Sequence, residues 1–215
     1  MLLLVSGATT TVRRINDPRV GVLVVPRARN NPMSLGLRPG KWGMDNGAFG
    51  AFDAASFVRM LDTFQACETC AGCVFVAAPD VVGNARATRD LFEQWAPRIR
   101  GRGFPVALVA QDGLTVPLTP WKHIDALFIG GTTTFKLGLE ARTLAAYAKA
   151  RGKWVHMGRV NGSVRTRYAY ALGCDSVDGS SFSRWPAIRI PLWQGWMNTL
   201  QSSHRSIPPL ETRSA

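Results

Sequence analysis

Short, continuous apolar runs recur along the whole chain, and they restrict its fold more than any other feature. Most are four to six residues long and apolar throughout, rather than alternating between apolar and polar positions. Strands that are buried on both faces of a parallel sheet have this pattern. We therefore expect eight strands, at 2–5, 21–25, 41–44, 73–78, 105–110, 126–130, 153–157 and 174–177.

Segments with a helical pattern lie between several of these runs. Asp53 and Asn84 are residue types that commonly cap the start of a helix, and Gly152 and Gly173 suit a helix end. Because strands that alternate with helices form βαβ units, the sheet is expected to be parallel. The expected helices span 54–67, 85–100, 139–152, 163–173 and, as a last helix, 187–201.

This order of elements predicts an α/β fold in the form of a compact (β/α)8 TIM-like barrel. The first units of the barrel are expected to be irregular, because residues 26–40 have the composition of a loop. A doubly wound open sheet is the alternative architecture. We expect a single catalytic barrel domain at 1–203 and a loose C-terminal tail at 204–215.

The composition is that of a folded domain with a basic surface. Of 215 residues, 46% are hydrophobic, and 26 lysines and arginines outnumber 14 acidic residues to give a formal net charge of +12. This charge favours a polyanionic partner, most simply nucleic acid, although a basic surface without such a partner has the same composition. No apolar run approaches the roughly 20 residues that a membrane-spanning helix needs, so we expect a cytoplasmic protein.

Three of the four cysteines are spaced like metal ligands. They are Cys67, Cys70 and Cys73, and the fourth is Cys174. A structural zinc site normally needs four ligands, and neither Cys174 nor a histidine lies near the three in sequence. The alternative interpretation is that they are small residues at a helix end and a strand start. We therefore expect no metal.

Acids, amides, bases and glycines lie at or just after the ends of six of the expected strands. In either α/β architecture the active site lies at the carboxyl ends of the strands, so a barrel would gather these side chains around one mouth. Any one of them alone is more often a turn former, a helix cap or a buried core histidine. They are Asp45 and Asn46; Asp80; Gln111; Gly130, Gly131 and Lys136; His156 and Arg159; and Asp178 and Arg184.

These residue types suit chemistry at the anomeric carbon of a sugar. One carboxylate can attack C1′ while a second handles the proton of the leaving group. Amide and carboxylate groups can read the edge of a base, and glycines let the backbone approach a flat ring. A basic rim would hold phosphates.

Several short motifs, in order along residues 41–185, resemble those of the tRNA-guanine transglycosylases. The family carries Thr-Asp-Ser-Gly-Gly-Phe, Phe-Asp-Glu-Cys, Val-Gln-Gly-Gly, a Gly-Gly-Leu-Ala-Val-Gly-Glu loop, and finally His-x-Leu-Met-Gly-x-Gly, Gly-x-Asp-x-Phe-Asp and Pro-Thr-Arg. The matching segments of this chain are MDNGAF, AAPDVV, VAQDG, FIGGTTTFK and HMGRVN…GCDSVDG…SR.

The resemblance implies a (β/α)8 barrel that exchanges guanine for a 7-deazaguanine base through a covalent glycosyl-aspartate. Asp178 takes the place of the nucleophile, because it is the second aspartate of the Gly-x-Asp-x-x-Asp pattern, and Asp45 takes the place of the proton-handling aspartate. Arg159, Arg184 and Lys136 are the expected phosphate contacts at the mouth. The expected substrate-binding residues are Asp80, Gln111, Gly130, Gly131, His156, Met157 and Asn46.

The chain departs from the tRNA enzymes in two respects that change the expected substrate, a missing zinc subdomain and a shorter length. Those enzymes carry a zinc subdomain of three cysteines and a histidine after the nucleophile, whereas no cysteine follows Asp178 here. In this and in its shortness the chain resembles the compact phage and bacterial relatives that insert 7-deazapurines into DNA. We therefore expect DNA, or another nucleic acid, and a 7-deazaguanine base such as preQ0 as substrates, with no cofactor.

The expected location is the cytoplasm, or the host cytoplasm if the protein is phage-encoded. Two alternative functions remain open. One is an enzyme that passes the sugar to water or to another acceptor, as a DNA glycosylase, nucleoside hydrolase or deoxyribosyltransferase does. The other is a barrel that binds nucleic acid without catalysis.

Overall fold

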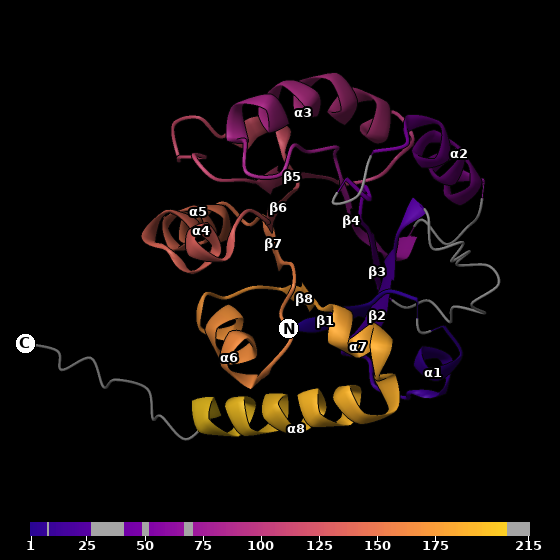
Figure 1. Ribbon diagram of the computed structural model, residues 1–215, viewed down its shortest axis with the longest axis vertical. Coiled ribbons are helices and arrows are strands. Elements are labelled where there is room, and N and C mark those ends of the chain that lie inside the picture. Colours follow the sequence, from indigo (N-terminus) through magenta and orange to yellow (C-terminus); the bar gives the residue numbers. More distant parts are fainter. Residues whose placement is uncertain (8, 27–40, 49–51, 67–70, 206–215) are drawn as a thin grey trace, which may run out of the picture.

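The strands of the computed structural model close into a barrel in which each strand pairs in parallel with the next and β1 pairs with β8 (Figure 1). The structure describes residues 1–7, 9–26, 41–48, 52–66 and 71–205. The predicted barrel is confirmed, and the open sheet is excluded. The strands are β1 (Leu2–Val5), β2 (Val20–Val24), β3 (Trp42–Met44), β4 (Cys73–Ala77), β5 (Val106–Ala110), β6 (Ala126–Ile129), β7 (Trp154–Met157) and β8 (Ser176–Asp178).

Helices surround this barrel on the outside (Figure 1). All the predicted helices are present, and the last one continues to Arg205, past the expected domain end at 203. No helix within the described segments is long and apolar enough to cross a membrane. The helices are α1 (Thr9–Arg14), α2 (Ala54–Gln65), α3 (Ala85–Arg100), the 3-10 helix η3 (Trp121–His123), α4 (Thr133–Leu137), α5 (Leu139–Ala150), α6 (Ser163–Ala171), α7 (Ser180–Arg184) and α8 (Pro186–Arg205).

Three short helices, α1, α4 and α7, were not expected from the sequence. Each has only five or six residues, too few to show a helical period. Between β5 and β6 the described chain forms η3 in place of an α-helix. The first units were expected to be irregular because of residues 26–40. Nearly all of that segment lies outside the described residues, as does the tail from 206.

Helices α2 and α3 begin directly after the capping residues that the sequence predicts. The side chain of Asp53 accepts a hydrogen bond from the backbone N–H of Ser56 at the start of α2. Asn84 accepts one from Ala87 at the start of α3 in the same way. Each cap satisfies a donor that the first helical turn leaves unpaired.

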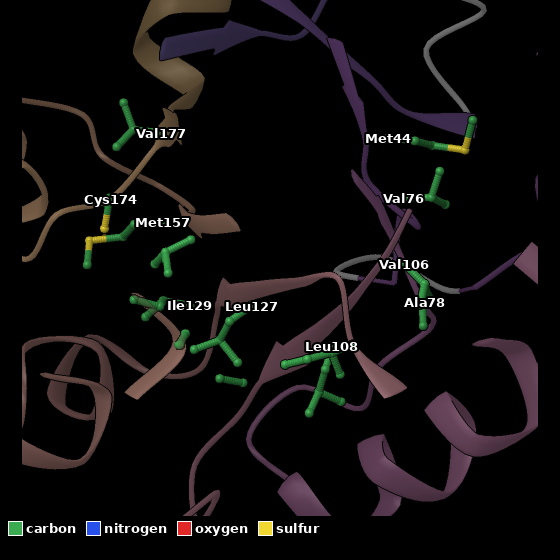
Figure 2. Packing of buried hydrophobic residues seen from close by; sticks show 14 of the residues in the cluster. Met44, Val76, Ala78, Val106, Leu108, Leu127, Ile129, Met157, Cys174 and Val177 are labelled. Carbon is green, nitrogen blue, oxygen red and sulfur yellow. The ribbon is translucent and has the colours of Figure 1, made fainter. Parts of the chain in front are cut away.

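Alternate residues of the strands supply two separate cores. One set points out against the helices, and Figure 2 shows Leu108, Leu127, Ile129, Met157 and Val177 in this outer core. The other set fills the inside of the barrel and consists of Leu4, Leu23, Phe75, Ala77, Ala107, Val109, Ala126 and Phe128. Burial on both faces explains why the strands read as continuous apolar runs. Each large side chain that is fully buried contributes roughly 1.5–3 kcal/mol to stability.

Candidate active site

The pair formed by His156 and Asp178 lies at the carboxyl ends of the neighbouring strands β7 and β8. The Nε2 atom of His156 is 2.9 Å from Oδ2 of Asp178. The imidazole is fully buried inside the barrel, with ring centroids 4.8 Å from Phe75 and 4.4 Å from Phe128. The Asp178 side chain keeps 16% of its surface exposed. The carboxylate therefore reaches the mouth while the histidine supports it from below.

A chain of hydrogen bonds inside the barrel determines which ring nitrogen of His156 carries the proton. The Nε1–H group of Trp154, which can only donate, lies 2.9 Å from Oγ of Ser176. The Ser176 hydroxyl lies 2.8 Å from Nδ1 of His156. Every hydrogen of these groups has an acceptor when Ser176 donates to Nδ1 and Nε2–H donates to Asp178. The chain of hydrogen bonds therefore favours the tautomer with its proton on Nε2.

The sequence analysis missed Trp154 and Ser176. The signal that could have found them is the period of two along a strand, because a residue two positions before an inward-facing residue points inward as well. Trp154 precedes His156 by that spacing, and Ser176 precedes Asp178. Polar groups at both positions are unusual in an interior otherwise filled by apolar side chains.

Arg159 holds the other oxygen of Asp178 through its backbone. Its N–H donates to Oδ1 at 3.2 Å, and the N–H of Val160 donates to the Asp178 carbonyl at 2.6 Å. Arg159 has φ of 61°, a left-handed conformation that non-glycine residues seldom adopt. Its guanidinium donates to the carbonyl of Gly131, and its own carbonyl accepts from Arg165 at 3.1 Å. Such a conformation persists only when several contacts hold it, and it is common at functional sites.

Asp175 lies at the opposite end of β8 from the mouth, although it is only three residues before Asp178. Its two carboxylate oxygens accept from Nζ of Lys149 at 2.7 and 2.8 Å. The backbone N–H of Val155, near the start of β7, donates to it at 2.8 Å. This aspartate ties helix α5 to the base of the barrel, so the geometry separates the roles of the two acids.

Asp80 is held by two amides that the sequence had also singled out. Nδ2 of Asn46 donates to Oδ1 at 2.8 Å, and Nε2 of Gln111 donates to Oδ2 at 2.5 Å. Both amide side chains are buried. Burial raises the pKa of Asp80, while these two hydrogen bonds act in the opposite direction. Three neighbouring strand ends thus build one group that can accept hydrogen bonds from a flat ligand.

Asp45 is the carboxyl group whose protonation the site changes most. Burial raises its pKa to about 6, and the negative charges of Asp178 and Asp80 act in the same direction. The backbone N–H of Gly47 donates to its Oδ1 at 3.2 Å and opposes part of that shift. All three carboxyl groups lie at the carboxyl ends of parallel barrel strands, so they share one mouth. A carboxyl group with such a pKa can both give and take a proton near neutral pH.

Gly130 and Gly131 leave room where a side chain would collide with the site. A Cβ on Gly130 would lie 3.1 Å from Nε2 of Gln111 and 2.8 Å from Cγ1 of Val109. Gly131 has φ of 70°, and its Cβ would lie 2.6 Å from Phe135. The backbone of this loop therefore approaches the amide of Gln111 directly, as expected for a wall that accepts a flat ring.

Two of the predicted contacts, Met157 and Lys136, have buried side chains. Met157 points out into the helix-facing core, where it is buried (Figure 2), because it follows the inward-facing His156 by one position. Lys136 is also buried and donates to the carbonyl of Gly158 at 2.6 Å, so it does not lie on a phosphate-binding rim. Burial, together with the charge of Arg159, lowers the pKa of Lys136 to about 8. Arg184 is exposed at the end of α7.

Within the described part of the chain, no three side chains of histidine, cysteine, aspartate and glutamate are grouped so that they could hold a metal ion. Cys67 and Cys70 lie outside the described residues. Cys73 begins β4, and Cys174 is buried before β8.

No family model and no curated protein matches the chain. Among solved structures it is similar to a cube-shaped, highly porous protein cage that was designed by fusing symmetric oligomeric domains. The two chains are 12% identical, the TM-score is 0.50, and the match covers 95% of this chain and 76% of the other. At this identity the similarity supports the barrel fold alone.

Proposed function

We propose that the protein is a base-exchange glycosyltransferase that replaces guanine in DNA with a 7-deazaguanine derivative. In the first step a carboxylate oxygen of Asp178 attacks C1′ of the target nucleotide. The bond from C1′ to the base breaks, its electron pair leaves with guanine, and Asp45 gives the departing base a proton. In the second step Asp45 takes a proton from the incoming base, whose ring nitrogen attacks C1′ and releases Asp178.

One observation carries this proposal: the site holds two nearby carboxyl groups in opposed environments. Burial and the charge of Asp178 raise the pKa of Asp45 to about 6, which suits the proton donor and acceptor. Asp178 instead receives an N–H group on each oxygen, from His156 and from Arg159. Pairs of carboxyl groups that differ in this way divide the roles of acid and nucleophile.

Asp80 and its two amides give the proposed site a means of reading the base. Asn46 donates one hydrogen bond to Oδ1 of Asp80, and Gln111 donates one to Oδ2. Each oxygen keeps a further lone pair that can accept from a ligand. A guanine presents N–H donors on its Watson–Crick edge, and so does a 7-deazaguanine. Asp80 would accept from that edge.

The charge and the sequence resemblance favour nucleic acid as the other substrate. The formal net charge of +12 would attract the phosphate backbone. A base inside a duplex is hidden by stacking, so the enzyme would flip it out or act on an open strand. The order of the transglycosylase-like motifs along the chain agrees with the same substrate class.

The test is mass spectrometry of digested DNA after incubation with the protein and preQ0. Base exchange places the 7-deazaguanine nucleoside in the digest, and hydrolysis leaves abasic sites instead. Asp45→Asn should slow exchange by about 10²- to 10⁴-fold, the usual contribution of general acid–base assistance. Asp175→Asn is the matched control, because Asp175 lies at the other end of the barrel. A digest with neither product would overturn the proposal.

A further inference from the structure

A cavity of about 430 Å³ lies beside the candidate active site, between the start of α3 and the loop that follows β5. Gly83, Arg86 and Arg89 line one side, and Asp112 and Leu118 line the other. The volume is within the range of pockets that hold small molecules, and a nucleotide would fit it. None of the residues proposed for catalysis or base reading lines it.

The cavity is nevertheless linked directly to the base-reading group. The backbone N–H of Gly83, on the cavity wall, donates to Oε1 of Gln111 at 2.9 Å. The other end of the same amide donates to Asp80. A nucleotide placed in the cavity would therefore neighbour a base held at Asp80.

The two arginines make this cavity suitable for an anion. Arg86 is exposed and Arg89 is half-buried. Nε of Arg89 is shielded from solvent and makes no hydrogen bond to the described residues. Its nearest acid is Glu93, with Oε1 at 3.4 Å on a side chain that is 59% exposed. Both guanidinium groups line the cavity, so an anion placed there would meet two positive charges.

The acidic group on the cavity wall, Asp112, already accepts hydrogen bonds from Thr132. Both oxygens of Asp112 accept from Thr132, Oδ1 from the hydroxyl at 2.5 Å and Oδ2 from the backbone N–H at 2.8 Å. The helix end adds little, because the N–H groups of Ala85 and Ala87 donate to the Asp112 carbonyl and to Asn84. The arginine side chains would therefore make the main contacts with an anion.

We propose that this cavity is a phosphate-binding subsite for a nucleotide, held by Arg86 and Arg89. The proposal rests on the proposed function, in which the phosphate belongs to the DNA strand next to the target base. Leu118, which is 48% exposed, offers an apolar surface to the sugar or base of that nucleotide. The alternative source of the same chemistry is the phosphate of a free nucleotide.

The test measures how a fluorescein-labelled, guanine-containing single-stranded oligonucleotide binds across a salt series. Arg86→Gln and Arg89→Gln should each weaken binding and flatten the slope of log K against log salt by about 0.7, the contribution of one phosphate on a single strand. The control is Arg98→Gln, which removes an exposed arginine from the far end of α3 and should leave the slope unchanged. Thermal melting shows whether each variant is folded. If Arg89→Gln does not fold, Arg86→Gln alone decides the result.

A second probe identifies the source of the phosphate. Deoxyguanosine 5′-monophosphate is titrated by calorimetry, with deoxyguanosine as the phosphate-free control. Binding of the monophosphate that needs Arg86 and Arg89, with an unchanged oligonucleotide slope, supports the subsite and assigns it to a free nucleotide. If both variants match Arg98→Gln with both probes, the subsite is refuted. If the subsite is refuted but the wild type still exchanges the base, the proposed function stands. If binding depends on the two arginines but no base exchange occurs, the subsite stands and the proposed function is refuted.

Discussion

Nε2 of His156 lies 2.9 Å from Oδ2 of Asp178 because β7 and β8 pair in a register that sets His156 opposite Ser176. This register puts the histidine one step below the carboxylate, inside the barrel, and leaves Asp178 at the mouth. The same register brings Ser176 to within 2.8 Å of Nδ1. The proton on His156 is thereby directed at Asp178, which keeps that carboxylate oriented.

The first prediction is that the neutral imidazole of His156 adopts the tautomer with its proton on Nε2. Long-range ¹H–¹⁵N spectra distinguish the two ring tautomers, and the chain has only three histidines to assign. Ser176→Ala should give a mixture of tautomers, because Nδ1 then loses its donor. Trp154→Phe keeps an aromatic ring and removes only the N–H that fixes the serine. A wild-type His156 whose neutral ring carries its proton on Nδ1 would contradict this assignment.

The second prediction concerns stability and pH at Asp45. Its pKa is raised from 3.8 to about 6, so the folded protein favours the neutral acid, and ionisation destabilises the fold as pH rises through about 6. Asp45→Asn should therefore be more stable than wild type at pH 8, by up to about 3 kcal/mol at 1.4 kcal/mol per unit of pKa. The difference should disappear near pH 4. Urea denaturation at several pH values measures it.

Asp53→Asn is the matched control and should show the opposite sign. Hydrogen bonds from Ser56 lower the pKa of Asp53, so its carboxylate contributes stability above the ordinary pKa and loses it as pH falls. Asparagine caps a helix about as well as aspartate, which leaves charge as the difference. An Asp45→Asn variant that is less stable than wild type by the same amount at pH 4 and pH 8 would refute the assignment.

Both the strands and the residues of the mouth could be read from the sequence. The strands are buried on two faces, so their apolar runs are unbroken, and every polar residue that ends such a run is conspicuous. Asp45, Asp80, Gln111 and Asp178 were found in this way. Their placement at one mouth follows once the barrel closes.

The sequence could not place side chains that depend on strand phase or on loop shape. His156 and Met157 are adjacent, so only one of them can face the interior, and the apolar run does not indicate which. Lys136 follows a strand as a surface contact would, yet the α4 turn carries it inward to the carbonyl of Gly158. The left-handed conformation of Arg159 is accompanied by contacts with Gly131, which is distant in sequence, and with Arg165 on the following helix.

The third prediction is that the backbone of Arg159 is strained. Arg159→Gly and Arg159→Val both remove the guanidinium contacts, so the difference between them reports the backbone. Valine is disfavoured at φ of 61° and glycine is not, so the valine variant should be less stable by about 1–2 kcal/mol. Denaturation of the two variants side by side measures the difference. Equal stability would show that the left-handed conformation carries no such cost.

The fourth prediction is that Asp80 reads the base and does not contact phosphate. Hydrogen bonds to a charged group are worth about 1.5–3 kcal/mol, so Asp80→Ala should weaken binding of the incoming base about 10- to 150-fold. The salt dependence of oligonucleotide binding should stay as in the wild type. Titration with preQ0 and a salt series on the same variant separate the two effects. A flatter slope of log K against log salt for the oligonucleotide, with unchanged affinity for preQ0, would show that Asp80 affects phosphate binding and does not read the base.

The central claim is that Asp178 forms a covalent ester with the sugar, and trapping that ester tests it most directly. The protein is incubated with a guanine-containing oligonucleotide without an incoming base, denatured, and examined by gel and by peptide mass spectrometry. Wild type and Asp175→Asn should both give a slower band whose adduct maps to Asp178, while Asp178→Asn should give none. An adduct that persists in Asp178→Asn, or base exchange by wild type without any adduct, would contradict the account.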